Sequence, residues 1–325
     1  MNQEPVRANL GFLVFCLAYL ALGGCATSTT VVPVSAVPAA TPPASEVPFE
    51  PPPPLGPVFA PGQVRELVPG GAIDWSGKTA WARGAGVLDP GNPNRDLAWQ
   101  MAQRAATVVA QRNLLEIVKG VRVDSDTRFQ DLMAEHDSTY QRIEAVIKSA
   151  RQRSPARFDS LGGTVEVELE CDLYGEAGVE GTLLPSPVAG PPSGSVSVSA
   201  SDLSNPAREF LRHYSAVVLD AGGSNLKPSL FPKLYDDSGA LLLDPRELAY
   251  ADATRGCALQ YVGTLDQVRA RPEFGQPLVL RVREVRGRLG TDMVLARGDA
   301  DQLKGMEDGL EFLMGSGRVL VKLSP

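Results

Sequence analysis

Residues 164–173 constrain the fold more than any other part of the chain, because apolar and acidic side chains alternate there without a break. The apolar positions are Val165, Val167, Leu169, Cys171 and Leu173, and the acidic positions are Glu166, Glu168, Glu170 and Asp172. Successive side chains of a β-strand point to opposite faces of the sheet. The pattern therefore predicts a half-buried strand with one face in the core and the other face wet and acidic.

A long helix is predicted upstream, over residues 95–119, after a strand at 78–88 that Gly84 and Gly86 are expected to distort. Asn94 or Asp96 can cap the helix, and Gly120 ends it. Apolar residues at helical spacing predict the buried face: Leu97, Met101, Ala105, Val108 and Leu115. Four alanines broaden this face and allow a close approach to a sheet: Ala98, Ala102, Ala106 and Ala110.

A second helix and a hairpin complete the first folded unit, residues 74–175. The second helix is marked by apolar residues at helical spacing: Phe129, Leu132, Met133, His136, Tyr140, Ile143 and Ile147. Gly162-Gly163 predicts a hairpin turn between a short strand at 156–158 and the alternating strand. The unit is therefore expected to be α+β, a small antiparallel sheet with two helices covering one face.

Residues 207–325 are predicted to form a second, mixed α+β domain. Strands are expected at residues 215–219, 233–235, 241–243, 258–262, 278–285 and 319–323, with a helix near 300–314. The turn Asp236-Asp237-Ser238-Gly239 joins the second and third of these strands.

Two proline-rich stretches separate these parts. Residues 26–73 consist largely of Pro, Ala, Val, Ser and Thr, and are predicted to be a disordered, semi-rigid tether. A PxxP docking ligand is the alternative interpretation of this stretch. Residues 176–206 form a second linker rich in Gly, Ser and Pro, with a brief edge strand expected around Val196.

Residues 1–25 resemble the signal peptide and lipobox of bacterial lipoproteins. The uncharged run at 10–24 suits a signal peptide better than a membrane span of about 20 residues. It ends in Leu22-Gly23-Gly24-Cys25. The resemblance implies cleavage between Gly24 and Cys25, and a diacylglycerol on the Cys25 sulfur that anchors the protein in a membrane. The alternatives are an ordinary signal peptide cut near Cys25 and a short membrane anchor.

The order of several short motifs resembles the LPP-twenty family of bacterial lipoproteins, which is related to the N-terminal domain of the flagellar protein FlgT. The motifs are Trp81-Ala82-Arg83-Gly84-Ala85-Gly86, Gln111-Arg112-Asn113-Leu114-Leu115-Glu116, Gly163-Thr164-Val165-Glu166-Val167 and Leu173-Tyr174-Gly175. The resemblance implies a lipid-anchored protein without enzymatic activity. A role near the flagellum follows only by analogy with FlgT.

Motifs that suggest nucleotide chemistry fail on their spacing. Gly77-Lys78-Thr79 would need a glycine at position 72 to form a phosphate loop, and Ala72 stands there. Gly84-Ala85-Gly86 and Gly315-Ser316-Gly317 each lack the third glycine of a dinucleotide fingerprint. We expect no nucleotide or other cofactor.

The titratable residues also favour structural roles. His136 is expected to be a hydrogen-bonded core residue, and neither it nor His213 has neighbours spaced for a zinc site. The acidic residues of the alternating strand could bind calcium or act as acids and bases, but the alternation favours a solvated face. Cys171 and Cys257 are expected to be buried apolar residues, with a single disulfide between them as the alternative.

The sequence thus predicts a non-enzymatic envelope lipoprotein that presents two small domains on a proline-rich stalk. Its expected partners are a membrane, through the lipid on Cys25, and envelope proteins or peptidoglycan. The net charge of −7 gives no basic face for nucleic acid. Ala26 in place of aspartate favours the periplasmic side of an outer membrane, with surface exposure as an alternative. The competing function is a periplasmic hydrolase that uses carboxylates of the C-terminal domain. Asp220, Asp236 and Asp237 could form such a cluster, although their neighbours favour turns.

Overall fold

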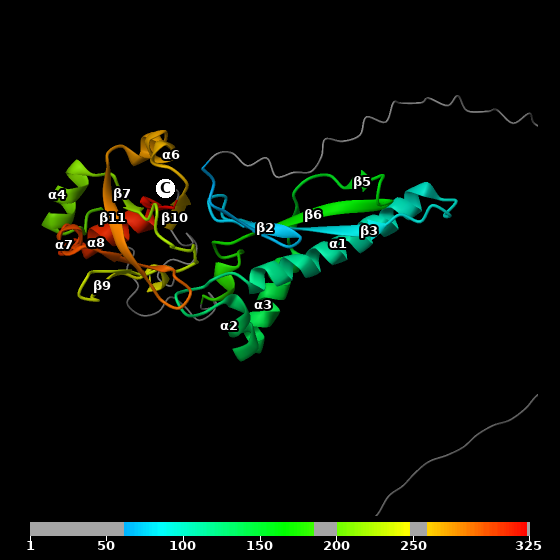
Figure 1. The fold of residues 1–325 in the computed structure, drawn as a ribbon, viewed down its shortest axis with the longest axis horizontal. Helices are drawn as coiled ribbons and strands as arrows, with labels where there is room; N and C mark the ends of the chain where they lie inside the picture. The colour runs from blue at the N-terminus through cyan, green and yellow to red at the C-terminus, as the bar shows by residue number, and fades with distance from the viewer. Residues whose placement is uncertain (1–61, 185–199, 248–258, 324–325) are drawn as a thin grey trace, which may run out of the picture. The chain divides into compact units, whose positions relative to one another are not determined.

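Two β-sheets with helices packed against them make up the computed structural model, which describes residues 62–184, 200–247 and 259–323 (Figure 1). Backbone contacts group Pro57–Pro325 into one compact unit. The predicted α+β class is confirmed, with a small antiparallel sheet followed by a mixed sheet. Gly24, Cys25, Val196 and Cys257 lie outside the described residues, so the lipobox and the edge strand stay predictions, whereas Cys171 is free and the alternative of a disulfide to Cys257 is not borne out.

The first sheet is wholly antiparallel and has the order β1-β2-β3-β6-β4, with β5 also paired to β6. Its strands are β1 (Arg65–Val68), β2 (Gly71–Asp74), β3 (Thr79–Val87), β4 (Arg151–Gln152), β5 (Arg157–Asp159) and β6 (Thr164–Asp172). The composition assigns residues up to 73 to the tether, yet β1 and β2 form a hairpin at the edge of this sheet. They pair because β2 supplies the buried Ala72 and Ile73 to the core.

Helix α1 (Arg95–Lys119) has the predicted bounds and lies along one face of this sheet, against β3 and β6 (Figure 1). The Asn94 side chain accepts a hydrogen bond from the Leu97 amide at 3.0 Å, and Gly120 is the C-cap. Strand β6 has the predicted alternation, and Val165, Val167, Leu169 and Cys171 are buried.

The second predicted helix is two helices, α2 (Phe129–Glu135) and α3 (Asp137–Lys148). His136 stands between them with an extended backbone, φ −134° and ψ 107°. Its side chain is exposed, so the prediction of a core histidine is wrong. The helix bends here because Ile143 and Ile147 of α3 are then directed into the core.

The second sheet has the order β10-β13-β7-β11-β12-β8-β9, in which β10, β13, β7 and β11 are parallel neighbours. Its strands are β7 (Ala216–Asp220), β8 (Leu234–Tyr235), β9 (Leu241–Leu243), β10 (Leu259–Val262), β11 (Pro277–Arg286), β12 (Asp292–Leu295) and β13 (Val319–Lys322). The six predicted strands are present, and β12 was not predicted.

Helices cover both faces of the second sheet. They are α4 (Asn205–His213), α6 (Leu265–Arg269), α7 (Arg297–Asp301) and α8 (Glu307–Gly315), with the short 3-10 turn η3 (Pro272–Phe274); a further 3-10 turn, η1 (Glu180–Thr182), follows β6 of the first sheet and contacts α3. Val217 and Leu219 of β7 belong to the main hydrophobic cluster with α4 and α8, whereas Ala216 and Val218 pack with α6 and η3. The helix predicted at 300–314 is thus α7 and α8, separated by a turn. Turn η1 and the start of α4 lie inside the predicted 176–206 linker.

Candidate functional site

The three carboxylates proposed for a hydrolase are each committed to a structural role. Asp220 pairs with Lys322 at 3.1 Å, and Asp237 lies 4.0 Å from Arg283. Asp236 closes the predicted turn by accepting the Ser238 and Ala240 amides, and it pairs with Lys304 at 2.8 Å. The bond to Lys304 holds the pKa of Asp236 well below its usual value. The amide hydrogen bonds and the ion pair hold Asp236 as an anion, whereas an acid–base pair needs a carboxyl group free to exchange a proton.

A cavity of about 510 Å³ lies beyond the carboxyl end of β7, where ligands often bind in parallel sheets. Its lining residues are Gly222, Gly223, Ser224, Arg281, Val282, Arg283, Ala296 and Asp299. This lining supplies one carboxylate, so it does not provide the pair that the hydrolase alternative requires. Within the described residues, no group of three or more His, Cys, Asp or Glu side chains is placed to hold a metal.

The acidic face of β6 is neutralised by arginines instead of being only wet. Arg83 on β3 lies 3.4 Å from Glu168, and Arg151 on β4 lies 2.8 Å from Asp172. The hydrogen bond to Asp172 raises the pKa of Arg151 above its ordinary value. With these partners in place, the face is an ion-paired sheet surface.

The remaining predicted features are also structural. Lys78 lies in the turn between β2 and β3 with φ +59°, and Asp74 accepts a hydrogen bond from the Gly77 amide at 2.7 Å. Strand β3 follows this turn, so Gly77-Lys78-Thr79 does not precede a helix as a phosphate loop does. His213 is exposed near the end of α4, 3.2 Å from Glu209. Cys171 is a free, buried thiol, and burial raises its pKa to about 12.

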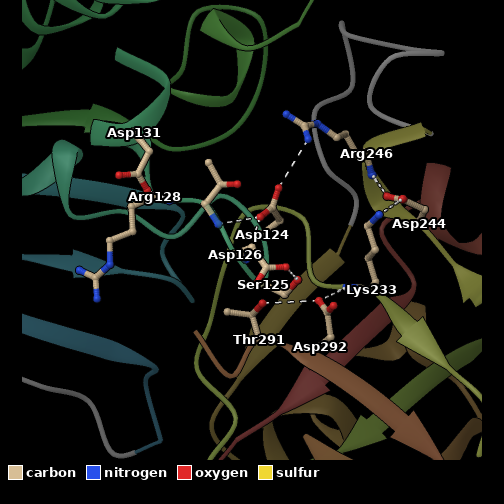
Figure 2. A network of polar contacts seen from close by, with 11 residues as sticks. Asp124, Ser125, Asp126, Arg128, Asp131, Lys233, Asp244, Arg246, Thr291 and Asp292 are labelled. Atoms are coloured by element: carbon tan, nitrogen blue, oxygen red, sulfur yellow. Dashed lines mark hydrogen bonds and ion pairs between the residues drawn. The ribbon is translucent and has the colours of Figure 1, made fainter. Parts of the chain in front are cut away.

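A polar network surrounds the loop between α1 and α2 (Figure 2). Asp124 of this loop lies 3.5 Å from Arg246, while Asp244 lies 2.9 Å from Lys233. Asp292 of β12 is buried and accepts the Lys233 amide at 3.0 Å. Burial raises the pKa of Asp292 above its usual value. The Asp124–Arg246 ion pair connects the loop to the segment that follows β9, and the network therefore has a structural role.

Arg122 forms a second, more deeply buried connection of this kind. Its side chain donates to Glu66 at 2.5 and 3.1 Å and to the Pro228 carbonyl at 2.7 Å. The residue is only 6% exposed. Its carbonyl accepts the Leu230 amide at 3.0 Å, and the Val123 carbonyl accepts the Phe231 amide at 2.8 Å. Arg122 therefore links β1 to the segment that leads into β8.

The outer face of α1, defined here by Leu97, Met101, Arg104 and Val108, is the feature that the fold does not explain. Leu97, Met101 and Val108 are 47%, 58% and 65% exposed. At 3.6 residues per turn they lie within about 40° of one another around the helix axis. A shallow hollow of about 620 Å³ borders this face, lined by Arg104 and Val108 and by the polar Gln100, Gln103 and Thr107 beside them.

The predicted buried face of α1 is correct for the four alanines and wrong for Leu97, Met101 and Val108, and Leu114, Ile117 and Val118 extend it toward the C-terminal end of the helix. Ala98, Ala102, Ala106 and Ala110 are all buried, and their stripe is centred roughly 140° from the outer face. They face Gly84 and Gly86 of β3, where the helix backbone lies against the strand. The larger side chains cannot fit in so narrow a space and are left outside.

The signal for the outer face was therefore present in the sequence as two apolar stripes on one helix. A helix that packs on one sheet needs a single buried stripe. Because the prediction treats the two stripes as one broad buried face, it does not separate the exposed stripe from the buried one. Of the residues named from sequence, Leu97, Met101 and Val108 are brought together here, while Leu115 is partly buried against the core.

Comparison with known proteins concerns the C-terminal part. Residues 216–325 match a family model described as the second domain of Treponema pallidum Tp0624. The match begins at the first residue of β7 and spans the parallel strands and helices α6 to α8. No curated protein matches the chain.

Proposed function

We propose that this protein is a non-enzymatic, lipid-anchored lipoprotein of the cell envelope that binds another protein through the outer face of α1. The observation that carries the proposal is the exposure of Leu97, Met101 and Val108 on a helix whose opposite face is already buried. Folded monomers rarely leave contiguous apolar patches in water unless a partner covers them.

The fold does not require these side chains to be apolar. Hydrophobic burial contributes about 25 cal/mol per Å² of apolar surface removed from water. The alanine stripe is buried against β3 and β6 and gains this free energy. The outer stripe stays exposed to water and gains little of it. Apolar residues in this position are therefore best explained by a complex in which they are covered.

Anchoring is supported by the lipobox resemblance at Cys25 and by the LPP-twenty resemblance of residues 81–175. No helix among the described residues is long and apolar enough to span a bilayer. In the proposal, the lipid on Cys25 holds the protein at the periplasmic face of the outer membrane, and the proline-rich tether extends the folded part toward its partner. The cavity near Gly222 does not favour the hydrolase alternative, for the reason given above.

Site-specific photo-crosslinking in intact cells tests the proposal. A photoreactive amino acid replaces Met101 in the full-length chain, and the control places it at Gln141, an exposed position on α3. The expected result is an adduct from position 101 that is absent from position 141, with the linked partner peptide identified by mass spectrometry. Equal adducts from both positions, or none from position 101, would overturn the proposal.

A further inference from the structure

The outer face of α1 has the spacing of a helix–helix seam. Four exposed positions recur at intervals of four, three and four residues: Leu97, Met101, Arg104 and Val108. This spacing keeps one stripe of a helix in contact with a second helix. The seam spans about 16 Å along the axis, which matches about three turns of a partner helix.

The charges on this seam are of one sign. Residues 97–115 contain no aspartate or glutamate, and their charged residues are Arg104 and Arg112. Neither arginine forms an ion pair with any residue that the structure describes. Arg104 lies in the seam itself, between Met101 and Val108. A partner that covers it must supply a carboxylate, because burying an unpaired cation is strongly unfavourable.

This charge pattern separates the candidate occupants. A second copy of the chain would bring two more arginines and no carboxylate to the seam. A membrane surface favours helices rich in Lys and Arg with aromatic residues on the apolar face. The exposed apolar side chains here are aliphatic, and Arg104 interrupts them at the centre. A helix with its own apolar stripe and a carboxylate opposite Arg104 satisfies both requirements.

We infer that the partner contributes an acidic amphipathic helix, which packs along α1 with an aspartate or glutamate paired to Arg104. This inference rests on the proposed function and specifies the chemistry of its partner. Arg104 makes the apolar seam specific, because it favours a partner with a carboxylate at the opposite position over a partner without one.

The test measures the yield of the position-101 adduct in Arg104→Glu and Arg104→Lys chains, and sequences the linked peptide. We expect Arg104→Glu to lower the yield at least about tenfold and Arg104→Lys to keep most of it. The linked peptide should show apolar residues three and four apart with nearby Asp or Glu. Replacing that acid by lysine in the partner should restore the yield with Arg104→Glu.

Two outcomes would overturn the inference while leaving the proposed function intact. They are a linked segment without acidic residues and an adduct yield that Arg104→Glu does not change. A linked peptide from this chain itself, a lipid adduct, or no adduct specific to position 101 would overturn both. Because Arg104 is exposed, unchanged thermal unfolding of each variant confirms that the fold is intact.

Discussion

Gly84 of β3 lies directly against Ala106 of α1: a Cβ atom placed on Gly84 would be 2.1 Å from the Ala106 carbonyl oxygen. Gly86 is in the same relation to the Ala102 carbonyl oxygen, also at 2.1 Å. Strand and helix backbones therefore touch without intervening side chains. This close approach selects the alanine stripe as the buried face and leaves the outer face of α1 in solvent.

Gly84→Ala is predicted to destabilise the fold by at least about 3 kcal/mol, because the added methyl group meets backbone that cannot move aside cheaply. Gly298→Ala is the matched control, since a Cβ at that position in α7 meets nothing within 4 Å. It should change the free energy of unfolding by no more than about 1 kcal/mol. Urea unfolding measures both, and equal effects of the two substitutions would contradict the account.

The same contact explains which parts of the helix were predictable. The caps and ends of α1 follow from local chemistry at Asn94 and Gly120, so the sequence predicts its bounds correctly. The choice of buried face depends on Gly84 and Gly86, which are distant in sequence from α1, and the prediction that they distort the strand is wrong. The register of β3 and β6 is in fact unbroken from Thr79 to Val87, and these glycines make room for α1.

Glu66→Ala is predicted to cost about 3 kcal/mol, because it leaves the buried Arg122 guanidinium without its carboxylate. Glu116→Ala provides the control. Glu116 pairs with Lys119 at 2.6 Å on the surface of α1, where an ion pair contributes less than about 1 kcal/mol. Chemical unfolding should rank the two substitutions in that order. If Glu66→Ala lowers the free energy of unfolding no more than Glu116→Ala does, the buried Arg122–Glu66 ion pair does not stabilise the fold as described.

Asp292→Asn should change how stability depends on pH. The folded protein holds the Asp292 proton more tightly than the unfolded chain does, because burial raises the pKa above 3.8. Wild-type stability therefore falls as pH rises from that value through the raised pKa. Asparagine cannot ionise and lacks this loss. The stability of the variant relative to wild type should rise across that window and then level off.

Urea unfolding at a series of pH values, from about pH 3 to pH 7, measures this difference. Asparagine can still accept the Lys233 amide, so the hydrogen bond seen for Asp292 is retained in the comparison. A difference that is flat across the series, or that falls as pH rises, would contradict the burial of an ionisable carboxyl group at this position.

Cys25→Ser is predicted to abolish lipid labelling and to release the protein from the membrane fraction, because the serine hydroxyl cannot form the thioether to diacylglycerol. Cys16→Ser, within the signal region, should leave labelling unchanged. Growth with radiolabelled palmitate followed by membrane fractionation measures both. Continued labelling of the Cys25→Ser chain would disprove the anchor.

The alternation and the runs of apolar residues made the sheets predictable. The candidate site, by contrast, depends on which of two apolar stripes of α1 packs against the sheet. The alternation in β6 and the apolar runs of β7, β11 and β13 correspond to strands because each pattern is local. The outer face of α1 could not be assigned in this way, since Leu97 and Ala98 are both apolar neighbours on one helix. Only the narrow space over Gly84 and Gly86 decides which of them is buried.

The most direct test of the account combines Leu97→Gln and Val108→Gln in the chain that carries the photoreactive residue at position 101. Both side chains are exposed, so thermal unfolding should remain unchanged. We expect the yield of the position-101 adduct to fall at least about tenfold, because two apolar contacts between the seam and its partner are lost. An undiminished yield would contradict the claim that the outer face of α1 binds the partner.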